Sequence, residues 1–298
     1  IGEYINGQPE EKSPQHQFIP GSAGIELQNK IDVCLNAKKN DFIEVNENGT
    51  YLNIRFSYID TEWISGVIMT IDDVTSLMNL ENNKKEFFQN ASHELKSPLT
   101  CIIGYQQMIT EGILDTKEQI LDSANKSLKE AIRMNDILSD MLSLATIEAR
   151  QTSLKENINP KAIIEDVVIT LSIEAKKNNI KISTDLDDNT LFASRTEFNE
   201  VVRNLIDNAI KYNKENGTIF VSYKDGILIV KDTGIGIKDE DKSRIFERFY
   251  RVDKARSKKT GGTGLGLAIV KHICLNNNYK LDLDSRLGLG TTFKIYFK

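Results

Sequence analysis

Hydrophobic residues recur every three to four positions through the middle of the chain, from Ser76 to about Arg150, and no strand-like alternation interrupts them. This period predicts α-helix. Gly112 and the pair Asp115–Thr116 break the pattern, which therefore predicts two helices joined by a short loop, an antiparallel hairpin. Two helices alone bury little surface, and a hairpin with one wide apolar stripe usually pairs with a second copy as a four-helix bundle. We therefore expect a homodimer through residues 78–150.

The segment before the hairpin has a mixed pattern. Residues 1–20 contain three prolines among polar residues, which predicts an irregular lead-in. A helical stretch from about Gly21 gives way to strand-like alternation over roughly residues 42–71. Within it, Asn48–Gly49 is a strong signal for a hairpin turn between two strands. The pattern predicts a small α+β unit over residues 21–77.

Helices and strands alternate after the hairpin, which predicts an α/β sandwich over residues 151–298. Pro160 opens this part, and Asp225–Gly226 marks a turn between two of its strands. The expected helices span about 160–178, 195–213, 238–248 and 262–278. The expected strands span about 180–186, 218–223, 227–232, 281–286 and 291–297.

Composition narrows the class of protein. The net charge of −5 gives no reason to expect nucleic acid as a partner. Cys34, Cys101 and Cys274 are far apart and odd in number, so they match neither a zinc site nor a disulfide framework and favour a reducing cytosol. No apolar run is long enough to span a bilayer, and there is no secretory leader. Ile1 in place of an initial Met indicates a fragment, so a membrane anchor upstream stays open.

The first candidate for chemistry is His93, one of three histidines, which is followed at once by Glu94. Both lie in the predicted first helix, about one turn before Pro98. An imidazole beside a carboxylate is the smallest group of side chains that can perform nucleophilic or acid–base chemistry near neutral pH. The pairing alone is a weak signal. It gains weight from asparagine- and glycine-rich motifs more than a hundred residues later.

Asn204 and Asn208 are four positions apart in a predicted helix, so their amide oxygens share a face. Neutral oxygens of this kind suit Mg²⁺, which keeps several waters and shares its other positions with phosphates. A solvated helix face would explain the same spacing equally well. The two asparagines therefore indicate a metal site only in combination with the glycine motifs that follow in the sequence.

Asp232 ends an apolar predicted strand and is followed by Gly234 and Gly236. A buried carboxylate needs a donor, and the exocyclic amine of adenine is one, whereas guanine presents an acceptor at that place. This favours ATP over GTP. Glycines let the backbone pass close to a ligand, although the same pattern also occurs in tight turns.

A second glycine run, residues 261–266, leads into a helix, where free amides and the helix dipole favour an anion. It differs from a P-loop, because no Gly-Lys-Ser/Thr follows. The preceding segment, residues 242–259, carries eight Lys or Arg against two acids. A basic run is often only a solvated surface, but its place between glycine motifs predicts a mobile flap over a triphosphate. A last glycine turn, residues 288–292, is explained equally well as purely structural.

Together these motifs resemble those of bacterial sensor histidine kinases of two-component signalling. The stretch from Ser92 to Leu99 is similar to the family's phosphoacceptor box, and the surroundings of Asn204 and Asn208 to its N box. Residues 232–236, 246–249 and 262–266 resemble the first glycine box, the F box and the second glycine box. Residues 21–75 resemble the later half of a PAS sensor domain, without evident earlier strands. The resemblance implies a dimeric phosphotransfer hairpin and an ATPase sandwich of the gyrase and chaperone type.

Carried over by position, the resemblance implies that His93 is phosphorylated, with Glu94 orienting and activating its ring. It implies ATP and Mg²⁺ as cofactors, with the metal held by Asn208 and supported by Asn204. The phosphoryl group would pass to an aspartate of a separate response regulator. The chain would be the cytoplasmic part of a membrane-anchored protein. The implied ATP-binding residues are Asn204, Asn208, Lys211, Tyr212, Asp232, Gly234, Gly236, Arg251, Gly262, Thr263, Gly264, Leu265 and Gly266, with Arg251 meeting the γ-phosphate.

Two positions depart from the family pattern. Ser97 stands where Thr or Asn is usual, at the position linked to dephosphorylation of the partner, which puts a phosphatase activity in question although a hydroxyl can still orient water. Glu200 stands where Gln is common, and we expect little effect. Two other hypotheses remain: a nucleotide-binding scaffold without kinase activity, which would need a broken box, and a chaperone- or repair-type ATPase, for which a histidine box has no use.

Overall fold

The computed structural model describes residues 22–149, 153–252 and 262–297, and the described chain divides into two compact units between Phe88 and Gln89. In the first unit, helix α1 (Ser22–Ala37) packs on an antiparallel sheet of β1 (Asp41–Glu47), β2 (Thr50–Asp60) and β3 (Ser65–Asp73), in that order. Asn48 and Gly49, both with positive φ, turn β1 into β2 as predicted. The core consists of Leu27, Cys34, Ile43, Ile54 and Phe56.

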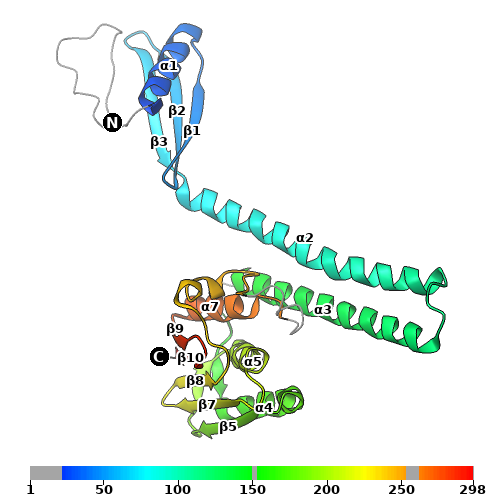
Figure 1. The fold of residues 1–298 in the computed structure, drawn as a ribbon. Helices are drawn as coiled ribbons and strands as arrows, with labels where there is room; N and C mark the ends of the chain where they lie inside the picture. The colour runs from blue at the N-terminus through cyan, green and yellow to red at the C-terminus, as the bar shows by residue number, and fades with distance from the viewer. Residues whose placement is uncertain (1–21, 150–152, 253–261, 298) are drawn as a thin grey trace. The chain divides into compact units, whose positions relative to one another are not determined.

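The predicted helical hairpin is confirmed. Helix α2 spans Thr75–Thr110 and helix α3 spans Lys117–Ala149, and the two run side by side towards their loop (Figure 1). Gly112, with φ of 67°, ends the first helix. Thr116 and Gln119 begin the second as a capping box, because Thr116 Oγ1 accepts from Gln119 N at 3.2 Å and Gln119 Oε1 accepts from Thr116 N at 3.3 Å.

Pro98 is a buried residue inside α2, and the helix continues past it to Thr110. Because proline has no N–H, the carbonyl of Glu94, four residues earlier, loses its helical hydrogen bond. The helical turn after His93 therefore lacks one backbone hydrogen bond. Within the described residues, no helix is both long and apolar enough to span a membrane.

The last part of the chain is the predicted α/β sandwich. Helices α4 (Pro160–Lys177), α5 (Arg195–Lys211) and α7 (Gly266–Asn277) pack beside a five-stranded sheet (Figure 1). The strand order is β5-β7-β8-β10-β9, and only the pair β5–β7 is parallel. The strands are β5 (Lys181–Leu186), β7 (Thr218–Lys224), β8 (Ile227–Asp232), β9 (Lys280–Arg286) and β10 (Gly290–Tyr296). The buried apolar faces of α5 and of these strands form the core.

Three details of the sandwich differ from the prediction. The expected helix at 238–248 is two short 3₁₀ turns, η1 (Asp239–Asp241) and η2 (Arg244–Phe246), because the segment has no apolar stripe and buries only Ile245. Helix α7 begins four residues later than expected, because residues 262–265 form the loop before it. Two three-residue strands, β4 (Glu156–Ile158) and β6 (Leu191–Ala193), were not predicted, since a period of two cannot be seen in three residues. The lead-in 1–20 lies outside the described residues.

Candidate active site

Helix α5 positions the first group of candidate residues. Ser194 caps its start, and its buried apolar face leaves Asn204, Asn208 and Lys211 half-buried at one edge. Asn204 Nδ2 donates to the carbonyl of Glu200 at 2.9 Å, which fixes the amide and turns Oδ1 away from the helix backbone. Lys211 Nζ pairs with Asp207 at 2.7 Å. Burial by itself lowers the pKa of Lys211, but Asp207 outweighs this and the net direction is upward.

Asp232, at the end of β8, is 7% exposed. Its Oδ1 accepts from the backbone N–H of Gly234 at 2.7 Å and of Thr291 at 3.2 Å. The described residues provide no donor to Oδ2, which leaves one oxygen for a ligand. Burial raises the pKa of Asp232, and these two N–H groups offset part of that rise. The geometry fits the predicted role of accepting from the adenine amine.

Gly234 and Gly236 stand where no side chain fits. A Cβ on Gly234 would lie 2.3 Å from the backbone oxygen of Tyr212, and a Cβ on Gly236 would lie 2.0 Å from that of Arg286. The turn after β8 therefore passes directly against the end of α5. This close approach places Asp232 beside the residues of α5.

We expect Gly234→Ala to disturb both neighbours, because its Cβ would also lie 2.7 Å from Asp232 Oδ1. Overpacking of this kind costs roughly 1–3 kcal/mol. Urea unfolding should show that loss of stability, and calorimetry should show weaker ADP binding. Gly104→Ala is the matched control, since no atom lies within 4 Å of its Cβ in α2. Equal stability and ADP affinity in the two variants would contradict the close approach.

The second glycine run brings α7 against α5. A Cβ on Gly266 would lie 2.5 Å from Asn204 Oδ1, so only glycine allows this approach without displacing that amide. A Cβ on Gly262 would lie 3.4 Å from Tyr212 Oη, and one on Gly264, where φ is 77°, would lie 2.9 Å from the backbone of Phe249. Leu265 is fully buried. Residues 253–259 of the expected flap and Gly261 of the glycine run lie outside the described residues.

The donor set around α5 fits a magnesium nucleotide. Among the residues that the structure describes, no group of three His, Cys, Asp or Glu could hold a metal by itself. Asn204 and Asn208 are four residues apart and share a face of α5, and the Asn204 amide oxygen lies close to Gly266 of the glycine run. A metal held this way would need phosphate oxygens and waters as its other ligands, which is the usual arrangement for Mg²⁺.

His93 and Ser97 are both exposed and lie one turn apart on α2, so they share a face of the helix. Glu94 points to two arginines. Its Oε2 lies 3.2 Å from Nη2 of Arg251 and 3.4 Å from Nη2 of Arg133, which is on α3. Burial lowers the pKa of Arg251, and Glu94 opposes this shift. Arg251, predicted to meet a γ-phosphate, therefore contacts the residue next to His93.

Further contacts join the sandwich to α3. Thr263 Oγ1 donates to Asp140 Oδ2 at 2.6 Å, and burial raises the pKa of Asp140. Near the end of α3, Glu148 Oε1 contacts Arg248 Nη2 at 2.5 Å and His272 Nε2 at 3.3 Å. The sequence pattern gives no signal for Arg133, Asp140 or Glu148, because on a long polar helix they resemble ordinary surface charges. The nucleotide motifs and the histidine hairpin are thus connected through side chains.

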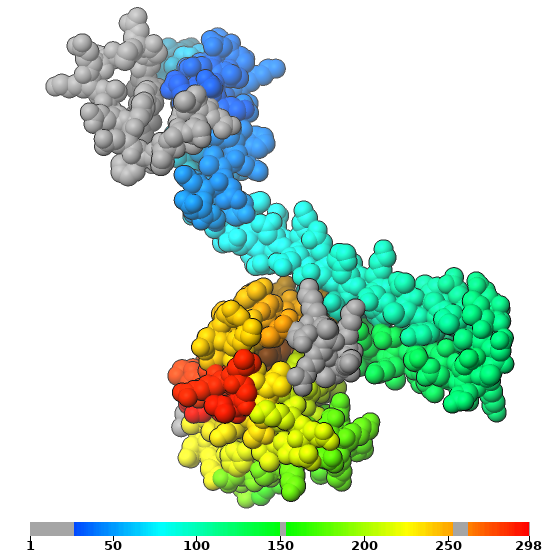
Figure 2. Space-filling view, viewed as in Figure 1, coloured from blue at the N-terminus to red at the C-terminus, as the bar shows by residue number. Residues whose placement is uncertain are grey.

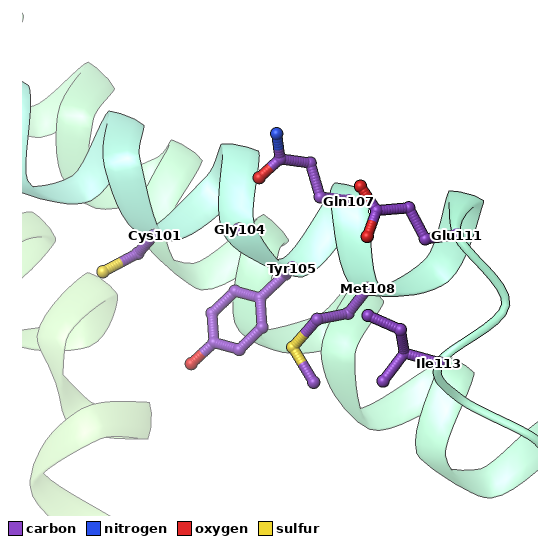
Figure 3. Close-up of a pocket in the computed structure, with 7 residues that line it drawn as sticks. All are labelled: Cys101, Gly104, Tyr105, Gln107, Met108, Glu111 and Ile113. Carbon is purple, nitrogen blue, oxygen red and sulfur yellow. The ribbon is translucent and has the colours of Figure 1, made fainter.

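A separate shallow pocket of about 430 Å³ lies near the loop of the hairpin (Figure 3). Its lining includes Tyr105, Met108 and Ile113, whose side chains point to the same side in the close-up. It contains none of the predicted site residues. The space-filling view shows α2 and α3 in contact up to their loop, with this end of the hairpin not covered by the sandwich (Figure 2).

Comparison with known proteins agrees with these motifs. Residues 83–150 match the family model described as His Kinase A (phospho-acceptor) domain, and residues 193–298 match that of the histidine kinase-, DNA gyrase B- and HSP90-like ATPase. Sensor protein SrrB of Staphylococcus aureus is 32% identical over 288 residues, which are 90% of this chain and 48% of that protein. The phosphate regulon sensor protein PhoR of Pseudomonas aeruginosa is 36% identical over 236 residues, 77% of this chain and 53% of that protein.

Among solved structures, histidine kinase ThkA in complex with the response regulator protein TrrA matches with a TM-score of 0.56 and 26% identity, over 91% of this chain and 82% of that one. The chain spans about half the length of the two curated relatives, at 48% and 53%. Both parts of the predicted architecture, the helical hairpin and the ATPase sandwich, are confirmed by these matches. This chain belongs to the bacterial two-component sensor histidine kinases.

Proposed function

We propose that the chain is an ATP-dependent protein-histidine kinase that phosphorylates His93 and then passes the phosphoryl group to an aspartate of a response regulator. The observation that carries the proposal is the contact of Arg251, from the ATPase sandwich, with Glu94, the neighbour of His93. This contact joins the ATPase sandwich to the helical hairpin, directly beside the histidine that would be phosphorylated. ThkA, solved in complex with a response regulator, supports the partner.

In this proposal, nucleotide binding and phosphoryl transfer are carried out by different residues. Asp232 selects the base through its free oxygen, while Asn204 and Asn208 face the phosphates. Mg²⁺, when bound, would neutralise phosphate charge and hold the phosphates in position. His93 would attack phosphorus through the lone pair of one ring nitrogen, while the other ring nitrogen carries the N–H. Glu94 would accept one ring N–H, which leaves the lone pair of the other nitrogen for phosphorus.

The test is incubation of the purified chain with Mg²⁺ and γ-labelled ATP. We expect label that is lost in acid and kept in alkali, as a phosphorus–nitrogen bond requires, and that does not form without Mg²⁺. Acid-stable label would contradict a phosphohistidine. Continuous ATP hydrolysis without label would favour the chaperone-type ATPase, and nucleotide binding without either would favour the scaffold.

We also propose a homodimer through the hairpin, as the predicted four-helix bundle requires. Leu121, Leu128 and Ile132 on α3 are 53–59% exposed although they lie at helical spacing on one face. A second copy of the hairpin would bury them. Leu121 and Leu128 are seven residues apart, which is the spacing of a bundle seam. A cytoplasmic location within a membrane-anchored sensor is part of the same proposal and is supported by relatives named as sensor proteins.

We expect Leu128→Asp combined with Ile132→Asp to convert the dimer to a monomer, because each buried carboxylate would lose its hydration without a partner. Light scattering after gel filtration measures the mass directly. Lys129→Asp is the control, since Lys129 is an exposed polar residue on the same helix. A wild-type chain that is monomeric, or a double variant that stays dimeric, would contradict this interface.

A further inference from the structure

The cluster around Glu94 has more donors than acceptors. Arg133 and Arg251 contact the same oxygen, Oε2, at 3.4 and 3.2 Å. The other ion pair of Arg133, with Glu130, is longer, at 3.8 Å. A guanidinium group has five N–H donors in a fixed planar fork, so one shared carboxylate oxygen satisfies only a small part of this pair.

Both arginines are taken out of water. Their side chains are 11% exposed for Arg133 and 5% for Arg251, whereas the side chain of Glu94 is 32% exposed. The Nε atoms of both arginines are buried and have no hydrogen-bond partner among the described residues. A buried donor without an acceptor destabilises the folded state, and more strongly when the group is charged. Two such donors side by side indicate a site whose acceptor is a bound anion.

The position of the pair defines which anion. Arg251 lies two residues after Phe249, whose backbone N–H donates to the carbonyl of Gly264 in the glycine run at 2.9 Å. Arg133 lies seven residues, or about 10 Å of helix, before Asp140, which binds Thr263 of the glycine run. On its other side the pair contacts Glu94, next to His93. It therefore lies between the nucleotide residues and the phosphoacceptor.

We propose that Arg133 and Arg251 together form a binding site for a phosphoryl dianion beside His93, which replaces Glu94 on the two guanidinium groups. Two planar guanidinium groups that approach from different directions can donate N–H hydrogen bonds to several oxygens of one phosphate. The inference rests on the proposed function for the source of the group, which is either the γ-phosphate of ATP or the phosphoryl carried by His93. Displacement of Glu94 would free its carboxylate for the imidazole N–H.

Calorimetric titration with AMPPNP and with ADP, each with Mg²⁺, tests the first source without any turnover. If the site takes the γ-phosphate, Arg133→Gln weakens AMPPNP binding about 10-fold, as expected for loss of a charge-assisted hydrogen bond, and changes ADP binding less than about 2-fold. Arg133→Lys keeps the charge without the fork and should lose part of this preference. Lys129→Gln on the same helix is the control and should leave both affinities unchanged.

The second source is tested on chain phosphorylated at His93 with phosphoramidate and freed of nucleotide. If the site takes this phosphoryl group, Arg133→Gln moves its ³¹P resonance and shortens its lifetime, while AMPPNP and ADP affinities stay as in the wild type. Circular dichroism and gel filtration check that the variants are folded. If Arg133→Gln unfolds, Arg133→Lys is used in its place for the nucleotide titration and for the ³¹P measurement.

No change in the AMPPNP to ADP ratio and no change in the ³¹P signal would overturn the site. Failure of the kinase proposal would look different. In that case AMPPNP would still bind more tightly than ADP in an Arg133-dependent manner, but ATP would never label the wild-type chain.

Discussion

Replacing His93 by Gln is expected to abolish phosphoryl incorporation from ATP completely, with ADP affinity unchanged within about 2-fold. Glutamine keeps a polar side chain on the exposed face of α2 but has no nitrogen lone pair that can attack phosphorus. The nucleotide residues lie on α5, after β8 and before α7, so none of them depends on the imidazole. Labelling with γ-labelled ATP and calorimetry with ADP measure the two effects on one protein sample.

Two companion variants sharpen this result. Glu94→Gln should slow labelling by about 10²- to 10⁴-fold without removing it, as is typical for loss of a general base. His16→Gln replaces a histidine of the predicted lead-in, outside all of the motifs, and should label like the wild type. Label that persists in His93→Gln would show that another residue is the acceptor and would contradict the proposed chemistry.

Replacing Asp232 by Asn is expected to weaken ATP binding by about 10- to 100-fold, which is the loss of a hydrogen bond to a charged acceptor in a buried site. The reason lies in the two backbone donors, Gly234 N and Thr291 N, which both point at Oδ1. In the Asp232→Asn variant the single amide oxygen must accept from these two donors. An NH₂ group at that position would place its own N–H groups against the backbone N–H groups. The NH₂ group then takes the place of Oδ2 and faces the adenine amine, donor against donor.

The same variant should bind GTP no worse than the wild type, because the carbonyl oxygen of guanine can accept from the new NH₂ group. The ratio of ATP to GTP affinity is therefore the decisive quantity, measured by competition against a fluorescent nucleotide. Asp225→Asn, in the exposed turn between β7 and β8, is the matched control. An equal loss of both nucleotides would indicate that Asp232 supports the fold rather than reads the base.

The elements that the sequence predicts well are those with strong local signals. The hairpin has a helical period over about seventy residues, and its loop is marked by Gly112 and by the Thr116–Gln119 capping box. Asn48–Gly49 and Asp225–Gly226 adopt positive φ, as their turns require. Gly234 and Gly236 could also be recognised from the sequence, because they stand in a short glycine motif directly after a predicted strand. At Gly234 and Gly236 a side chain would collide with backbone, so the sequence shows the constraint directly.

The contacts between the hairpin and the sandwich could not be predicted. Arg133, Asp140 and Glu148 are charged residues on α3, and nothing in their spacing says which of them faces solvent. The sandwich partners of Asp140 and Glu148 are at least a hundred residues away in sequence. The resemblance to known kinases gave Arg251 a phosphate partner, whereas the structure places it against Glu94. Only three-dimensional packing shows that these residues meet.

Mass-spectrometric mapping of the wild-type chain after incubation with Mg²⁺ and ATP tests the central claim most directly, provided the sample is digested at neutral or alkaline pH to preserve phosphohistidine. We predict one modified peptide, the one that contains His93, with fragment ions that place the phosphoryl group on its imidazole, and no modification after incubation with ADP. A phosphoryl group on any other residue, or an unmodified His93 peptide in a chain that binds ATP, would contradict the account.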